Sequence, residues 1–266
     1  MTDWTGRRTS DDGVSESIGF LLIFGMVIVG IGLVTLYGYP MLLQQQTSAD
    51  KQIMQKNMIV LQNDMKSLAY KTVPYKETML NIGGGTLTVH NTSYVPHVSS
   101  MRIYNTGTGQ DYELAFHPGD LQYYSLNANT EITLENGAVV MRNLVEPGSV
   151  MLAQPRWFYD AQTNTMVINL ISLNSSYSIA RSGVGTVQMS MGMTNYSVMP
   201  GITSPVCVKY TPDATQNYKI AWDNYFTTVL QMTSGSCGAD EFQLPPAMSS
   251  GGTLVIKKYD IVITSV

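Results

Sequence analysis

Residues 13–40 read GVSESIGFLLIFGMVIVGIGLVTLYGYP and form the most apolar stretch of the chain. No Asp, Glu, Lys or Arg occurs from Ser17 to Thr47. The apolar core Ile18–Gly38 spans about 21 residues, the length at which a helix crosses a hydrocarbon layer of about 30 Å. A cleaved secretory signal has a shorter apolar region of about 7–15 residues, which ends at a small-residue site. The stretch therefore predicts a membrane-spanning helix rather than a discarded signal.

The charges on either side of this stretch predict its orientation. Arg7 and Arg8 precede it, and the next basic residue is Lys51. Because flanking basic residues stay on the cytoplasmic side, we expect the N-terminus in the cytoplasm and everything after Tyr39 outside the cell. The polar and acidic residues after Arg8 argue against a twin-arginine export signal.

The start of the stretch, Val14-Ser15-Glu16-Ser17-Ile18-Gly19-Phe20, resembles the N-terminal segment of archaeal type IV pilin-like proteins, which carry a class III signal peptide. The resemblance covers residues 7–45. It implies that a peptidase cuts near Gly13–Val14, that the apolar helix stays intact, and that Glu16 pairs with the new N-terminal amine of a neighbouring subunit. Asp11-Asp12 stand where that family has basic residues, and Glu16 would be the third rather than the fifth residue after the cut.

Taken by position alone, Glu16 has two interpretations. A carboxylate at the edge of an apolar helix lies at the headgroup level near the helix N-terminus, or it neutralises a charge supplied by another subunit. Gly25 and Gly32 lie two turns apart on one face and permit close approach of a second helix, although no strict GxxxG occurs. Glu16, Gly25 and Gly32 are therefore the candidate assembly residues.

A second helical pattern follows the apolar stretch. Apolar residues alternate at spacings of four and three, as on one face of an amphipathic helix: Met54, Met58, Leu61, Met65 and Leu68. Pro40 should kink or briefly interrupt the helix between the two parts, because it lacks a backbone donor. Packing against the chain's own downstream domain and packing between subunits both agree with this pattern.

From about Thr78 the chain changes to short β-rich runs separated by turn signals, which is typical of a sandwich or barrel. The clearest hairpin is Ile132–Met141, in which Asn136-Gly137 suits a type I′ turn. Its register places four residues on the expected core face, namely Ile132, Leu134, Val139 and Met141. The other predicted strands are Thr86–His90, Ser100–Tyr104, Met166–Leu173, Thr186–Met191 and Leu254–Val266.

One short helix is predicted inside this β-rich region. Its core-facing stripe consists of Tyr218, Trp222, Tyr225, Val229 and Met232. It lies between Cys207 and Cys237, which are the cysteines of the chain. A disulfide closing this loop of about 30 residues would stabilise the fold by about 3–4 kcal/mol. An extracellular location favours the disulfide over two buried free thiols.

These predictions combine into an α+β chain. A long N-terminal transmembrane and stalk helix precedes a mainly antiparallel β-sandwich-like head with one short helix. We expect a cytoplasmic leader over 1–13, an apolar transmembrane or filament-core helix over 14–40, an amphipathic stalk helix over 41–75 and an extracellular β-rich head over 76–266.

The composition narrows the classes of partner. Charged residues make up 13% of the chain, against about 25% in a typical soluble domain. The net charge of −4 gives no basic footprint, so we expect no nucleic-acid partner. Glycosylation motifs occur at Asn91, Asn174 and Asn195, and glycans there would help keep a surface so poor in charge soluble.

No motif in the chain predicts catalysis. The histidines, His90, His97 and His117, are not surrounded by metal-ligand patterns. Gly83-Gly84-Gly85 and Gly183-Val184-Gly185 lack the strand-then-helix context of a phosphate loop and predict turns or bulges instead. A G-x-S-x-G nucleophile elbow does not occur. We therefore expect a protein that is not an enzyme, with no catalytic residue, no cofactor and no metal.

The sequence favours a pilin-like archaeal cell-surface structural protein. Its N-terminal helix lies in the membrane or in a filament core and displays the head outside the cell. Its expected partners are the membrane, further copies of the chain through the N-terminal helix, and glycans. The alternative is a single-pass anchored surface adhesin, glycan-binding or envelope protein that does not assemble into filaments.

Overall fold

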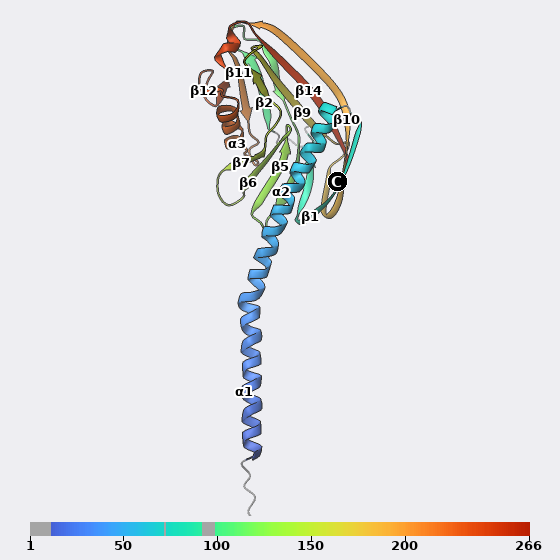
Figure 1. Ribbon diagram of the computed structural model, residues 1–266, viewed down its shortest axis with the longest axis vertical. Helices are drawn as coiled ribbons and strands as arrows, with labels where there is room; N and C mark the ends of the chain where they lie inside the picture. Colours follow the sequence, from blue (N-terminus) through green and yellow to red (C-terminus); the bar gives the residue numbers. More distant parts are fainter. Residues whose placement is uncertain (1–11, 72, 92–98) are drawn as a thin grey trace, which may run out of the picture. The chain divides into compact units, whose positions relative to one another are not determined.

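The computed structural model describes residues 12–71, 73–91 and 99–266, without the side chains of residues 12–16 (Figure 1). The chain divides into two compact units that meet between Ala49 and Asp50. This boundary falls inside the predicted stalk segment, 41–75. The second part of that segment therefore belongs to the head rather than to a separate stalk.

The first unit is helical. Helix α1 (Asp12–Leu33) passes into the π-helical turn η1 (Val34–Gly38), and α2 (Tyr39–Lys71) continues from there. The backbone N–H of Tyr39 donates to the carbonyl of Val34, the wider spacing of a π turn. We predicted an interruption at Gly38–Pro40, and the structure has it as this π turn just before the proline. The turn accommodates the missing donor of Pro40 without ending the helix.

The second unit begins with the last part of α2, which covers one face of a large sheet (Figure 1). The seam residues Met54, Met58, Leu61, Met65 and Leu68 are all buried there. They pack with apolar side chains of the sheet, among them Leu80, Ile132 and Ile261. Of the two arrangements that the sequence left open, the chain adopts packing against its own downstream domain.

The large sheet contains the strands that lie nearest to α2. Across it their order is β7 (Ser149–Ala153), β6 (Ala138–Asn143), β5 (Thr130–Glu135), β4 (Asp120–Ser125), β1 (Tyr75–His90), β10 (Ile179–Ile202), β14 (Gly252–Ser265), β9 (Thr165–Asn174) and β8 (Phe158–Asp160). Neighbouring strands are antiparallel, except that β14 and β9 run parallel. The predicted mainly antiparallel head is thus confirmed.

A smaller antiparallel sheet packs against the other face of the large one. Its strands, in order, are β12 (Thr233–Ser234), β13 (Glu241–Gln243), β11 (Val206–Thr211), β2 (Ser100–Asn105) and β3 (Asp111–Phe116). Helix α3 (Lys219–Asn224) and the short 3-10 helix η3 (Pro246–Ser249) contribute to the same core. The head therefore has helix α2, the large sheet, and the smaller sheet with α3 as successive layers.

The predicted hairpin is present, but it is buried on both faces. Asn136 and Gly137 have φ of 46° and 74°, as a type I′ turn requires. Ile132 pairs with Met141 on the core face, as predicted, and this face packs against α2. The opposite face, about which the hairpin register made no prediction, is covered by the smaller sheet and α3. The alternating pattern shows which residues share a face, and it does not show how many layers cover the strand.

The predicted aromatic helix needs one correction. Tyr218, Trp222, Tyr225 and Met232 are buried as expected, whereas Val229 is 43% exposed. The reason is a second π-helical turn, η2 (Tyr225–Val229), which follows α3. A π turn has more residues per turn than an α-helix, so Phe226 takes the buried position instead.

The glycine runs form bulges, as predicted. Gly83 pairs with Gly183 across β1 and β10 at a shift in register, and both have positive φ. At Gly85 an added Cβ would lie 2.5 Å from the ring of Tyr123, so only glycine fits. Because bulges bend a strand without ending it, β10 is much longer than the predicted strand Thr186–Met191.

Candidate membrane and assembly surface

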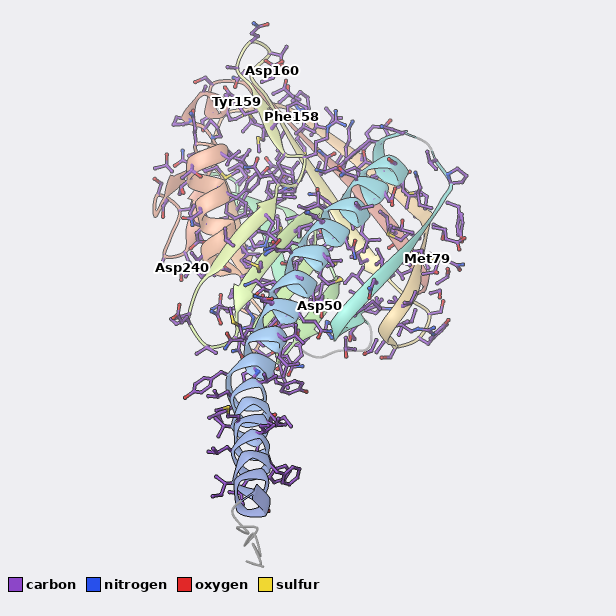
Figure 2. All side chains as sticks on the ribbon, turned by 60° about the horizontal axis from the view of Figure 1, so that its bottom comes forward. Asp50, Met79, Phe158, Tyr159, Asp160 and Asp240 are labelled. Carbon is purple, nitrogen blue, oxygen red and sulfur yellow. A yellow bond between two sulfur atoms is a disulfide. The ribbon has the colours of Figure 1, made fainter. Side chains whose placement is uncertain are left out.

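Helix α1 and the start of α2 carry an apolar surface that is exposed. Every large apolar side chain from Ile18 to Leu43 is exposed, from 43% at Leu43 to 73% at Met26. Figure 2 shows these side chains standing outward on every side of the helix. A helix that is apolar all round is stable only when lipid or other helices surround it.

Within the described residues, Ser17–Lys71 is the helix long and apolar enough to cross a membrane. Tyr37 and Tyr39, both exposed, stand near the end of its apolar part. Tyrosines of this kind lie at the membrane–water interface. Ile18–Leu36 then spans about 28 Å, close to the thickness of the hydrocarbon core.

The predicted assembly glycines are open to a partner. At Gly25 and at Gly32 an added Cβ would meet no atom within 4 Å. Gly25 also lies in a shallow groove together with Leu22, Met26 and Gly30. Gly25 and Gly30 therefore leave the least side-chain bulk on one part of the helix surface, where a second helix can approach most closely.

The predicted processing and pairing residues lie at the edge of the described chain. Helix α1 begins at Asp12, so its backbone includes Gly13, Val14 and Glu16. The side chains of residues 12–16, and residues 1–11 altogether, lie outside the described residues. The cut at Gly13–Val14 and the role of Glu16 stay predictions.

The predicted disulfide is present in the head. Cys207 on β11 bonds to Cys237 in the loop after β12, with 6.2 Å between the two Cα atoms. The bond encloses α3, η2 and β12 and fastens this insertion to the smaller sheet. A disulfide indicates an extracellular domain, and the long apolar helix indicates membrane anchoring.

The three glycosylation motifs differ in accessibility. Asn195 on β10 is exposed. Asn174 is half-buried, and its Nδ2 donates to Asp260. Asn91 is buried, and its Nδ2 donates to the carbonyl of Ser175 at 2.6 Å. Glycosylation stays a prediction at all three, with Asn195 the most accessible acceptor and Asn91 the least.

The histidines of the described residues have structural contacts. Nδ1 of His90 lies 2.8 Å from Oδ1 of Asp120, and Nδ1 of His117 lies 3.3 Å from the carbonyl oxygen of Ser99. His97 lies outside the described residues. Among those that are described, His, Cys, Asp and Glu form no group of three that could hold a metal ion.

Sequence reasoning missed a group of buried carboxylates on β5. Glu131 accepts a hydrogen bond from Nη2 of Arg142 at 2.7 Å and another from the hydroxyl of Tyr218. Glu135 accepts from Ser99, from Tyr210 and, at 3.2 Å, from Nε1 of Trp222. The signal was present as polar residues alternating with Ile132 and Leu134, but an alternating polar face normally contacts solvent.

Burial changes the pKa of two carboxyl groups of the head core, Glu135 and Asp120. It raises the pKa of Glu135 to about 7, although the hydrogen bond from Ser99 acts in the opposite direction. Burial also raises the pKa of Asp120, against the effect of His90. For His90, burial lowers the pKa, but the hydrogen bond and charge of Asp120 outweigh it and the net shift is upward. The head core therefore holds one carboxyl, that of Glu135, whose pKa lies near neutral pH.

Comparison with known proteins places these features in one family. An uncharacterized protein of Archaeoglobus fulgidus is 24% identical over 227 residues, which cover 70% of this chain and 73% of that protein. No solved structure matches the chain. The profile of a family of unknown function, DUF7289, matches residues 13–242, from the apolar helix to β13. Because the match covers most of the chain, the protein belongs to DUF7289, with an apolar helix and a β-rich head compatible with a membrane-anchored surface protein.

Proposed function

We propose that the protein is a pilin-like cell-surface subunit. Its N-terminal helix first spans the membrane and then packs against the same helix of neighbouring copies, while the head stays outside the cell. The proposal includes processing near Gly13–Val14 and pairing of Glu16 with the amine of a neighbour. It includes no catalytic chemistry and no cofactor.

The observation that carries the proposal is the length of the exposed apolar surface. With Tyr37 and Tyr39 at the membrane–water interface, the hydrocarbon core surrounds only the stretch of about 28 Å from Ile18 to Leu36. Met41, Leu42 and Leu43 come after these tyrosines and are still 62%, 61% and 43% exposed. A simple anchor leaves these side chains in water, whereas neighbouring helices in a filament core would cover them.

Burial of these three side chains by neighbouring helices would stabilise the assembly. Burial of an exposed Leu or Met side chain contributes about 1.5–3 kcal/mol. For the helix inside the membrane, the same change only exchanges lipid for protein, so close packing at Gly25 and Gly32 and pairing of Glu16 would have to supply specificity.

The packing of the head restricts where neighbours can bind. The seam from Met54 to Leu68 is buried within the head, so it offers no surface for a coiled coil between subunits. Assembly through the N-terminal helix would therefore use residues up to about the end of the first unit at Ala49. This is a shorter assembly surface than a helix extending to Lys71 would give.

The experiment compares the double variant Met41→Gln/Leu42→Gln with the native chain in cells. We expect the variant to remain in the membrane fraction, because Ile18–Leu36 is unchanged, and to lose filaments seen by electron microscopy. Val145→Gln, at a 71%-exposed position on the head, is the control and should keep filaments. Filaments of the double variant at the native level would contradict the role of these residues.

Mass spectrometry of the mature N-terminus tests processing separately. The proposal expects a chain that begins near Val14, and expects Glu16→Gln to be processed and inserted yet not assembled. A native chain that keeps residues 1–13 and never forms filaments would leave the single-pass anchored surface protein as the correct description.

A further inference from the structure

A polar cavity of about 850 Å³ opens between the last turns of α2 and the strand β7. Strand β7 is at the edge of the large sheet, so the cavity lies at the border of the head. The residues that give it chemical character are Asn63, Lys66, Tyr70, Lys71, Gln154 and Arg156. All belong to the second unit, and sequence reasoning assigned none of them a role.

The cavity gathers cations that no carboxylate balances. Elsewhere in the described head, six of the ten Lys and Arg side chains have an acidic partner within 4.0 Å, as Lys76 has in Asp64 and Arg142 has in Glu131. Within the described part of the chain, no such partner is found for Lys66, Lys71 or Arg156. The cavity is thus a local concentration of positive charge in a chain of net charge −4.

The contacts of Lys66 and Arg156 hold these two cations at the cavity without neutralising them. Nζ of Lys66 donates to the carbonyl of Gln154 at 3.2 Å, which leaves further donors of the ammonium group unused. The guanidinium of Arg156 lies over the ring of Tyr70, 4.9 Å from its centroid. Burial, and then the charge of Arg156, lower the pKa of Lys66. The two cations therefore repel each other across the cavity.

The end of α2 accounts for only part of this charge. A helix C-terminus carries about half a negative charge, which favours one nearby cation such as Lys71. Lys66 lies more than one turn before the end, and Arg156 comes from a different part of the chain. An anion between them would offset the remaining positive charge.

We propose that this cavity binds an acidic saccharide, through its carboxylate or sulfate group. The volume lies within the range of about 300–1,000 Å³ typical of small-molecule sites, far more than a single inorganic anion fills. Lys66 and Arg156 would hold the anionic group, since ammonium and guanidinium form strong charge-assisted hydrogen bonds to oxyanions. The amides of Asn63 and Gln154 suit hydroxyl groups, and the ring of Tyr70 supplies an apolar wall. This binding does not depend on assembly into filaments.

The test uses the full chain purified in detergent and isothermal titration calorimetry with D-glucuronate, D-glucose and inorganic sulfate. We expect saturable binding of glucuronate, with glucose and sulfate each at least tenfold weaker. Lys66→Met should weaken glucuronate binding at least tenfold while retaining most of the apolar stem. Lys56→Met, at an exposed cation on the same helix away from the cavity, should leave it unchanged.

Each other outcome would overturn the proposal. Sulfate binding as tight as glucuronate would indicate a simple anion site, and glucose binding as tight would remove the role of the cations. Equal affinity of Lys66→Met and the native chain would place binding elsewhere. Because Lys66 is partly buried, the exposed Arg156→Gln provides a second variant with little risk to folding, and it should also bind at least tenfold more weakly. Both variants should form filaments normally, which separates this proposal from the proposed function.

Discussion

The two parts of the long helix both carry apolar residues but arrange them differently. From Met54 to Leu68 the seam residues repeat along one face, and the head buries all five of them, whereas Val60 on the opposite side is exposed. From Ile18 to Leu43 large apolar side chains occur all round the helix, and all are exposed. A periodic stripe matches one packing surface, whereas a helix without a polar side needs surroundings on every side.

This difference shows which part of the molecule is self-sufficient. The head has cores on both faces of its large sheet, satisfied buried carboxylates and a disulfide, so its stability depends on its own contacts. The apolar helix depends on lipid or on other subunits. Substitutions in the head should therefore change its unfolding, and substitutions in the helix should change only insertion and assembly.

The largest contrast is expected between Leu61→Ala and Leu21→Ala. Leu61 is fully buried, and its truncation leaves a cavity that should lower the free energy of unfolding of the head by about 4 kcal/mol. Leu21 is 72% exposed, and the same change should leave that free energy unaltered. Urea unfolding of the full chain in detergent, followed by near-ultraviolet circular dichroism, measures both. Equal effects of the two substitutions would contradict the conclusion that only the buried seam stabilises the head.

Removal of the disulfide should have the next largest effect. Cys207→Ala/Cys237→Ala releases a loop of 30 residues and should destabilise the head by about 3–4 kcal/mol. Membrane insertion should not change, because the apolar helix is untouched. Urea unfolding measures the stability of the head, and membrane fractionation measures insertion. A clear loss of the variant from the membrane fraction would show that the two units are not independent.

The head should become less stable as the pH rises towards 7. Burial raises the pKa of Glu135 from 4.5 to about 7, so the folded head favours the protonated carboxyl. The contribution of Glu135 is complete below pH 4.5 and is lost as the pH rises through 7, a decrease on the order of 3 kcal/mol. Urea unfolding at several pH values measures it.

Glu135→Gln should remove this part of the pH dependence, because the amide does not titrate. The raised pKa values of Asp120 and His90 act in the same direction, so the variant should show a flatter profile rather than a level one. An unchanged profile would mean that Glu135 does not titrate in this range.

The smallest effect is expected at Ile53. It lies on α2 beside the buried seam but is 42% exposed. Ile53→Ala should change the free energy of unfolding by less than about 0.5 kcal/mol, as is usual for surface positions. A loss comparable to that at Leu61 would show that stabilisation by this helix is not confined to the buried seam.

Local signals predicted much of the fold. Asn136-Gly137 specified the hairpin because its turn needs two positive φ angles, and the glycine runs marked the bulges. The seam from Met54 to Leu68 specified a helix with one apolar face. The sequence could not name the partner of that face, because a spacing rule describes one surface and the partner comes from strands distant in the chain.

The remaining errors have the same origin. Glu131 and Glu135 alternate with apolar residues as if facing water, and only the tertiary fold brings Tyr218 and Trp222 to satisfy them. Val229 left the core because a π turn changed the helical spacing. The cations of the proposed saccharide site, on α2 and after β7, are likewise separate in sequence and adjacent only in the folded head.

Packing of the N-terminal helices against one another can be tested directly by cross-linking at Leu42 in intact cells. Both native cysteines are in the disulfide, so Leu42→Cys would add one free thiol on the surface assigned to neighbouring helices. After mild oxidation, we expect a disulfide-linked dimer on a non-reducing gel for this variant, and monomer only for Val145→Cys on the head. Monomer only at Leu42 would contradict packing of the helices against one another.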